Sequence, residues 1–230
     1  MMLNKNNLQL AQAASKEDSK YLLSGILVEP GFCVVTDGHQ MIIVSTDKTP
    51  PGDFPAIPGF TPVDEFEPFV LPRQTALEIQ KTIPNKANLP VLLVAAVGAP
   101  DENYVTLATT DLDTHRTFRS RKMTGQYPNW RQVVPKAEKS TFQITMGIDL
   151  MIRVLNQIKN FSDTATFRFQ DADSAVRIDA ANEGQTLTAI VMPIRNEKGV
   201  AAPEYAPLEK PVVAEPPVPV PAEVPEEVAA

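Results

Sequence analysis

The chain has 230 residues, 43% of them hydrophobic, which is enough for one large or two small domains with a sizeable core. Its single cysteine excludes an intramolecular disulfide, and no apolar stretch is long enough for a membrane span or a signal peptide, so we expect a cytoplasmic protein. The net charge is −7, but seven glutamates and two lysines after Arg195 carry −5 of it. The remaining −2 still allows a local basic face.

The first predicted unit is a short helix followed by strands. Residues 7–15 have a weakly amphipathic pattern that predicts a helix, and residues 22–29 and 32–45 predict strands separated by a Pro-Gly turn. Cys33 lies within an apolar strand, which indicates a packed thiol and not a nucleophile.

A proline-rich segment and a second unit come next. Residues 49–68 contain six prolines, too many for a central strand, and predict a surface loop or arm. Pro72 opens a helix that runs to Ile83, with an apolar stripe formed by Ala76, Ile79 and Ile83. Strands are predicted near residues 91–97, 104–110 and 114–123.

The third predicted unit repeats the order of helix and strands. Its helix has apolar residues at helical spacing: Ile148, Met151, Ile152, Leu155 and Ile158. Strands are predicted at residues 165–170, 175–180 and 186–194. The segment 196–230 is rich in Pro, Glu, Val and Ala and predicts a disordered tail, because it cannot bury enough apolar surface to offset the entropy of ordering.

Three motifs occur in an informative order. They are Thr36-Asp37-Gly38-His39 after the run 21–27, the segment 125–135 around Tyr127-Pro128-Asn129-Trp130-Arg131, and Val191-Met192-Pro193-Ile194-Arg195. The first two resemble the middle domain of bacterial β sliding clamps, the processivity factors of DNA polymerase III, and the third resembles the end of the last clamp domain. The small size and divergence of the chain suggest, on this resemblance alone, a phage or mobile-element origin.

The resemblance implies an α+β DNA-clamp fold of repeated helix-plus-antiparallel-sheet units in a closed oligomeric ring. Residues 1–135 would form one middle-type domain, 136–195 half of a last-type domain and 196–230 the tail. Clamp domains are pairs of units, and six domains with twelve inner helices surround duplex DNA. Three units per chain would then require four chains, a tetramer, with a trimer or a dimer as alternatives.

A clamp contacts DNA loosely through Lys and Arg, without reading its sequence. The candidate DNA-binding residues are Lys5, Lys16, Lys20, Tyr21, Arg73, Lys81, Arg153 and Lys159. Each of them could equally be an ordinary solvated residue. A denser basic cluster lies at residues 114–122, where charges on an edge strand would block unwanted pairing and where an approach to DNA is the alternative.

The resemblance also implies a pocket for short peptides of a DNA polymerase and a clamp loader. It falls on Leu23, Thr36, Gly38, His39, Gln40, Met41, Pro128, Gln132, Val133, Leu150, Val191, Met192, Pro193, Ile194 and Arg195. Apolar residues would hold a Leu or Phe of the partner, with Thr36 and His39 as polar anchors. Gln40 and Gln132 stand where the family has arginines, which suggests a different peptide motif.

Two other functions fit parts of the sequence. Asp37, His39, Asp111, Asp113 and His115 could suggest a metal-dependent hydrolase, but no helix-borne His pair, glycine-rich phosphate loop or nucleophile elbow accompanies them. We therefore expect a protein that is not an enzyme and has no cofactor. The second alternative is a clamp-like interaction module that keeps the peptide pocket and does not encircle DNA.

Overall fold

The computed structural model describes residues 1–135, 142–182 and 184–195. They divide into two compact units, an N-terminal unit, Met1–Pro128, and a C-terminal unit that begins at Asn129. Each unit is described by itself. The tail expected at 196–230, together with residues 136–141 of the expected half domain, lies outside the described residues.

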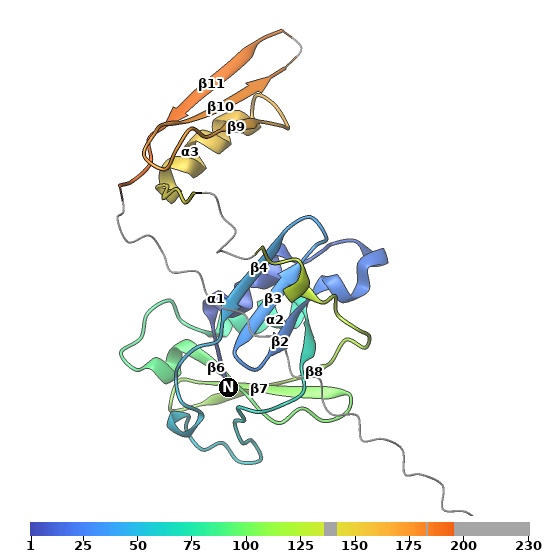
Figure 1. Cartoon of the computed structure of the whole chain (residues 1–230). Helices are drawn as coiled ribbons and strands as arrows, with labels where there is room; N and C mark the ends of the chain where they lie inside the picture. The colour runs from blue at the N-terminus through green and yellow to red at the C-terminus, as the bar shows by residue number, and fades with distance from the viewer. Residues whose placement is uncertain (136–141, 183, 196–230) are drawn as a thin grey trace, which may run out of the picture. The chain divides into compact units, whose positions relative to one another are not determined.

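The N-terminal unit contains two four-stranded antiparallel sheets and two α-helices (Figure 1). Repeat A is β1 (Met2–Asn4), α1 (Lys5–Gln9), β2 (Gly25–Glu29), β3 (Phe32–Thr36) and β4 (Met41–Ser45). Repeat B has the same order: β5 (Phe69–Pro72), α2 (Arg73–Thr82), β6 (Val94–Val97), β7 (Tyr104–Thr110) and β8 (His115–Arg121). Short 3-10 helices are Leu10–Ala13, Asp18–Ser24, Pro51–Asp53 and Pro90–Leu93.

The two repeats exchange their first strands. The sheet orders are β4-β3-β2-β5 and β1-β6-β7-β8, so β5 of repeat B completes the sheet of repeat A and β1 of repeat A completes the sheet of repeat B. Met2 pairs with Ala96, and Val70 pairs with Leu27, both in antiparallel register. Each repeat therefore needs the other for a complete sheet.

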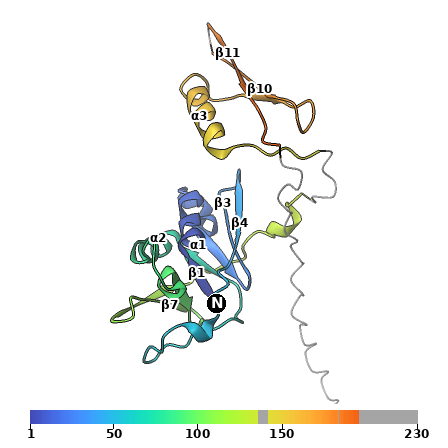
Figure 2. The same ribbon diagram turned by 90° about the vertical axis from the view of Figure 1, so that its left-hand side faces the viewer.

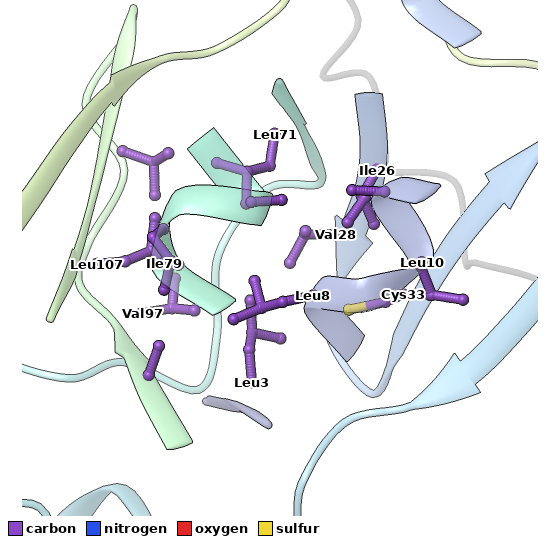
Figure 3. Close-up of a cluster of buried hydrophobic side chains, with 14 of the residues drawn as sticks. Leu3, Leu8, Leu10, Ile26, Val28, Cys33, Leu71, Ile79, Val97 and Leu107 are labelled. Carbon is purple, nitrogen blue, oxygen red and sulfur yellow. The ribbon is translucent and has the colours of Figure 1, made fainter. Parts of the chain in front are cut away.

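The core of this unit lies between the helices and the two sheets. The helices α1 and α2 contact each other (Figure 2). Figure 3 shows Leu3 and Leu8 near Ile79, Val97 and Leu107, and all five are fully buried. The apolar stripe predicted for the second helix is confirmed, because Ala76, Ile79 and Ile83 are all buried in this cluster.

Several predictions about this unit need correction. The strands β1 and β5 were not predicted, because three or four residues are too short to show an alternating pattern. The helix expected at 7–15 is an α-helix at Lys5–Gln9 that continues as a 3-10 helix. Asn4 caps its start, because the Asn4 side chain accepts the backbone N–H groups of Asn6 and Asn7.

The proline-rich segment 49–68 is not a free surface arm. Its Phe54 and Ile57 are buried, and they pack in a second cluster with Met2, Val94, Ala96 and Ala108. The segment therefore covers one face of the β1-β6-β7-β8 sheet. Its prolines exclude a central strand, but they do not exclude buried aromatic and aliphatic side chains.

The C-terminal unit contains one further repeat, repeat C. It consists of α3 (Ile148–Lys159), β9 (Thr166–Arg168), β10 (Val176–Ala181) and β11 (Thr186–Val191), and a 3-10 helix at Trp130–Gln132 precedes it. The sheet order is β11-β10-β9, which is one strand fewer than in each sheet of the N-terminal unit. Ile158, Val176, Ile178 and Val191 are at the centre of its small core. None of the helices in the described part of the chain is long and apolar enough to cross a membrane.

Candidate functional site

The corner between β3 and β4 is a tight turn organised by Asp37. The Asp37 Oδ1 accepts the backbone N–H of His39 at 2.8 Å and of Gln40 at 2.9 Å, and Thr36 Oγ1 donates to the Gln40 carbonyl oxygen at 2.6 Å. The two backbone N–H groups lower the pKa of Asp37 to about 2. Gly38 has φ +94°, a conformation that favours glycine.

The same turn occurs in repeat B, at the corner between β7 and β8. Thr110 Oγ1 donates to the Thr114 carbonyl oxygen at 2.9 Å, and Asp111 Oδ1 accepts the backbone N–H of Thr114 at 2.5 Å. Leu112 has the positive φ there, +79°. The Thr-Asp corner is thus a hairpin turn that occurs in both repeats, A and B. The exposed residues at its tip differ between the two repeats.

The N-terminal unit contains seven of the residues expected for the peptide pocket. Thr36 is buried, Leu23 and Met41 are half-buried, and the exposed ones are Gly38, His39, Gln40 and Pro128. The turn brings Thr36 and Gln40 into direct contact through their hydrogen bond. Met41 pairs with Thr36 across the two strands, so Thr36, Gln40 and Met41 lie together at this corner.

Two residues that were not predicted for the pocket lie at this corner. Lys20 Nζ donates to the Asp37 carbonyl oxygen at 3.3 Å and forms an ion pair with Glu17 at 3.1 Å. Burial raises the pKa of Tyr127 to about 12, and the nearby backbone N–H of Thr36 offsets only part of that rise. The sequence does not predict these two contacts, because neither Lys20 nor Tyr127 is near the Thr36 corner along the chain.

The C-terminal unit holds the other eight expected pocket residues. Val191 is buried in the core of repeat C and Pro193 is half-buried, while the exposed residues are Gln132, Val133, Leu150, Met192, Ile194 and Arg195. Leu150 and Ile194 come together around Gly147, because a Cβ at Gly147 would lie 3.6 Å from Ile194 Cδ1 and 3.8 Å from Leu150 Cβ. The expected pocket residues thus form two groups, one in each unit.

The predicted DNA-binding residues fall into two classes. Three side chains bond within the N-terminal unit: Lys5 donates to Asn85 Oδ1 at 2.6 Å, Arg73 Nε donates to the Ala11 carbonyl oxygen at 3.0 Å, and Lys20 binds the Asp37 corner. The others are exposed: Lys16, Tyr21, Lys81, Arg153 and Lys159. On α2 and α3, Lys81 and Arg153 share the exposed helix face with acidic residues, Glu78 and Asp149.

The basic cluster at residues 114–122 lies mainly on β8, which is confirmed as an edge strand of its sheet. Arg119 forms an ion pair with Asp101 at 3.1 Å and lies over the Tyr104 ring, 4.6 Å from its centre. This geometry fits the protective role of charges on an edge strand.

Two of the residues that could suggest enzyme chemistry, Asp37 and Asp111, have structural roles in hairpin turns. Among the described residues, no three His, Cys, Asp or Glu side chains are grouped as a metal ion would require. The carboxylates of Asp37 and Asp111 hold hairpin turns. Burial, with Glu29 nearby, raises the pKa of the Cys33 thiol, so it is a poor nucleophile.

The paired repeats, with two contacting helices and exchanged strands, are the architecture of a DNA-clamp domain, and solved structures support this class. A DNA polymerase sliding clamp from Pseudomonas aeruginosa matches with a TM-score of 0.59 and 16% identity over 85% of this chain and 51% of that one. The same organism's clamp bound to griselimycin gives 0.61 and 18%, over 85% and 50%. A putative DNA polymerase III β subunit from Eubacterium rectale gives 0.59 and 14%, over 84% and 50%.

The fold is therefore that of the bacterial β sliding clamps. The chain spans about half the length of the clamps that it matches. No protein-family model and no curated protein matches the chain. At these low identities the likeness defines the fold alone.

Proposed function

We propose that this protein is a sliding clamp, a processivity factor that encircles duplex DNA and tethers replication proteins to it. The observation that carries the proposal is the clamp fold itself, with TM-scores near 0.6 to bacterial clamps over about 85% of the chain. Such a protein performs no reaction and needs no cofactor. It holds DNA topologically and contacts phosphates loosely through exposed cations such as Lys81 and Arg153.

Each unit carries its own group of candidate tethering residues. Leu23 and Met41 in the N-terminal unit, and Leu150 and Ile194 in the C-terminal unit, offer apolar surface for a Leu or Phe of a polymerase or loader peptide. Met41 and Met192 suit a site with several partners, because methionine repacks easily. Gln40 and Gln132 are uncharged, so the preferred peptide would not depend on a carboxylate at those points.

The ring would contain four chains. Repeats A, B and C give each chain three helix-plus-sheet repeats, and a ring of the kind that the clamp resemblance implies has twelve. Homo-oligomers favour closed symmetry, which four chains can satisfy.

Retention on DNA of different topology tests the proposal. The protein is mixed with nicked circular DNA, and gel filtration at moderate salt measures how much stays bound before and after a single restriction cut. A sliding clamp remains on the circle and slides off the linear form. Equal retention on both forms would contradict encirclement.

A non-encircling interaction module is the second candidate, and one observation favours it. Arg73 and Lys20, two of the cations expected to meet DNA, are engaged in bonds within the N-terminal unit, and acidic Glu78 and Asp149 lie close to Lys81 and Arg153. Such a module would bind the peptide of a replication protein normally while showing no topological retention.

A further inference from the structure

All three repeats are closed by the same backbone hydrogen bond. The residue three positions before each helix accepts, through its carbonyl oxygen, the N–H of a residue two or three positions after the end of the last strand: Asp47 donates to Met2 at 3.1 Å, Met123 to Val70 at 3.0 Å and Ile194 to Thr145 at 2.7 Å. Repeat C is therefore built on the same plan as repeats A and B, including the segment before its helix.

The segment before the helix makes a second contact in repeats A and B that repeat C lacks. As β1 and β5, these segments pair with β6 and β2, the first strand after the helix of the sister repeat. In repeat C, residues 142–147 are not part of a sheet, and β9 has no strand partner on its outer side among the described residues. Repeat C thus contains both members of this strand pairing, the segment 142–147 and the outer edge of β9, and the two are not paired with each other.

The sequence of residues 142–147 suits this missing strand. Phe142, Ile144 and Met146 alternate with Gln143 and Thr145, which is the period-two pattern of a half-buried strand. Ile144 and Met146 already pack against the core of repeat C. Ile144 and Met146 correspond to Met1 and Leu3 of repeat A, which are both buried.

The helix α3 also has an apolar side that is not covered within its repeat. Met151, Val154 and Ile158 pack on the core. Beside them, at spacing i, i+4 and i+7, lie Ile148 (75% exposed), Ile152 (51%) and Leu155 (40%), which we call the α3 flank. Three large aliphatic side chains in a row on one helix are costly to leave in water.

The corresponding side of α2 is covered by the sister repeat. When the buried stripe of α2 is aligned with that of α3, Arg73 and Leu77 correspond to Ile148 and Ile152. Arg73 bonds to Ala11 of repeat A, and Leu77 packs on the shared core of the two repeats. The flank of α2 therefore faces its sister repeat, and the α3 flank has the position of a repeat-to-repeat contact.

We propose that repeat C pairs with repeat C of a second copy of this chain, so that two half domains form one complete clamp domain. The segment 142–147 of each copy adds a strand to β9 of the other, and the two α3 flanks pack together. Aligning β9 and β10 with β6 and β7 predicts the register: Thr145 of one copy opposite Thr166 of the other, as Met2 is opposite Ala96.

Charge complementarity favours a second copy as the occupant. The two-fold axis that relates the two strand pairings runs the two α3 helices antiparallel and places Ile152 of one copy near Leu155 of the other. Lys159 in the last turn of one helix then lies beside Asp149 in the first turn of the other, at both ends of the contact. Each charge also has the favourable sign for its helix end.

Cross-linking tests the register directly. Two variants, Thr145→Cys with an affinity tag and Thr166→Cys without one, are mixed and oxidised. Opposite residues in an antiparallel pair have Cα atoms about 4.5–5.5 Å apart, within disulfide reach. The expected product is a heterodimer that a reducing agent separates. Thr186→Cys on β11 replaces Thr166→Cys in the control, and Cys33 is buried in both variants.

A charge in the α3 flank tests the helix contact. Ile152→Glu should raise the dissociation constant of the dimer at least tenfold in sedimentation velocity runs without DNA, while Gln157→Glu on the exposed polar side leaves it unchanged. Since Ile152 is half-exposed in the single chain, the variant should still fold, which circular dichroism checks.

Several outcomes would overturn the pairing: a wild-type monomer up to about 100 μM, a cross-link that forms equally with Thr186→Cys, or a dimer that Ile152→Glu does not weaken. This inference deepens the proposed ring but fails separately from it. A chain that pairs through repeat C and slides off circular DNA contradicts only the clamp function. A chain retained on circles without this pairing contradicts only the interface.

Discussion

Gly25 of β2 lies so close to Val70 of β5 that a Cβ on Gly25 would come within 2.6 Å of Val70 Cγ1. It would also meet the Leu71 carbonyl oxygen and Met123 Sδ, each at 2.7 Å. This is the point where repeat B gives its first strand to the sheet of repeat A. The absence of a side chain at Gly25 therefore permits the strand exchange.

The first prediction follows from this close approach. Gly25→Ala should lower the free energy of unfolding by about 1–3 kcal/mol, because the added methyl group forces neighbouring backbone to move. Urea denaturation measures the change. Gly52→Ala is the control, since nothing lies within 4 Å of a Cβ there, and a similar decrease in both variants would show that crowding is not the cause.

The second prediction concerns the core between the helices. Ile79→Ala removes a fully buried side chain from α2 and should cost about 2–5 kcal/mol of unfolding free energy. Gln74→Ala on the exposed side of the same helix should stay within about 0.5 kcal/mol of wild type. Equal effects in chemical denaturation would be inconsistent with the packing of α2.

The third prediction concerns pH. The pKa of Asp37 is about 2 in the folded chain, below the ordinary value, so the carboxylate stabilises the fold above about pH 4 and this contribution disappears as the pH falls toward 2. Asp37→Asn can still accept hydrogen bonds but carries no charge. The difference in urea midpoint between wild type and Asp37→Asn should therefore be constant from about pH 5 to 8 and shrink between about pH 4 and 2. A difference that grows on acidification would refute the assignment.

The fourth prediction separates the peptide pocket from the repeated turn. His39 and Asp113 occupy equivalent positions in the two Thr-Asp corners, and both are exposed. If the peptide site includes the Thr36 corner, His39→Ala should weaken the binding of a fluorescent polymerase peptide several-fold in anisotropy titrations, because it removes the proposed polar anchor. Asp113→Ala should leave the affinity unchanged, and the reverse ranking would move the peptide site to repeat B.

The fifth prediction concerns DNA. If Lys81 and Arg153 contact phosphates, then Lys81→Gln and Arg153→Gln should each make the slope of log K against log[salt] less negative, by about 0.9 for each phosphate that is no longer neutralised. Arg119→Gln serves as the control, since Arg119 is paired with Asp101 on the edge strand. An unchanged slope in all three variants would exclude these helices from DNA binding.

The sequence predicted the regular elements well where their patterns are long. The helix α3 and the strand β7 have the predicted ranges to within a residue, because heptad-like and alternating spacing extends over several turns or pairs. The strands β1 and β5 could not be predicted, since a strand of three or four residues is specified by its distant partner and not by its own pattern. The burial of Phe54 and Ile57 could not be predicted, because the prolines around them indicate a surface loop.

The candidate site was less predictable than the fold. The Thr36 corner resembled a special motif, but Thr110 and Asp111 make the same hydrogen bonds without sharing the Gly-His sequence. The positions of Lys20 and Arg73 depend on contacts with Asp37 and Ala11, which are far away along the chain. Local pattern cannot reveal that such cations are already engaged.

The exchange of first strands has a kinetic consequence. Met2 can reach Ala96 only after most of the N-terminal unit, Met1–Pro128, has been synthesised, and β5 must find β2 across the intervening hairpin and proline-rich segment. Contacts of such long sequence separation slow folding, because loop closure precedes any gain from pairing. The N-terminal unit should therefore fold as one cooperative block after its release from the ribosome, with neither repeat accumulating as a stable intermediate.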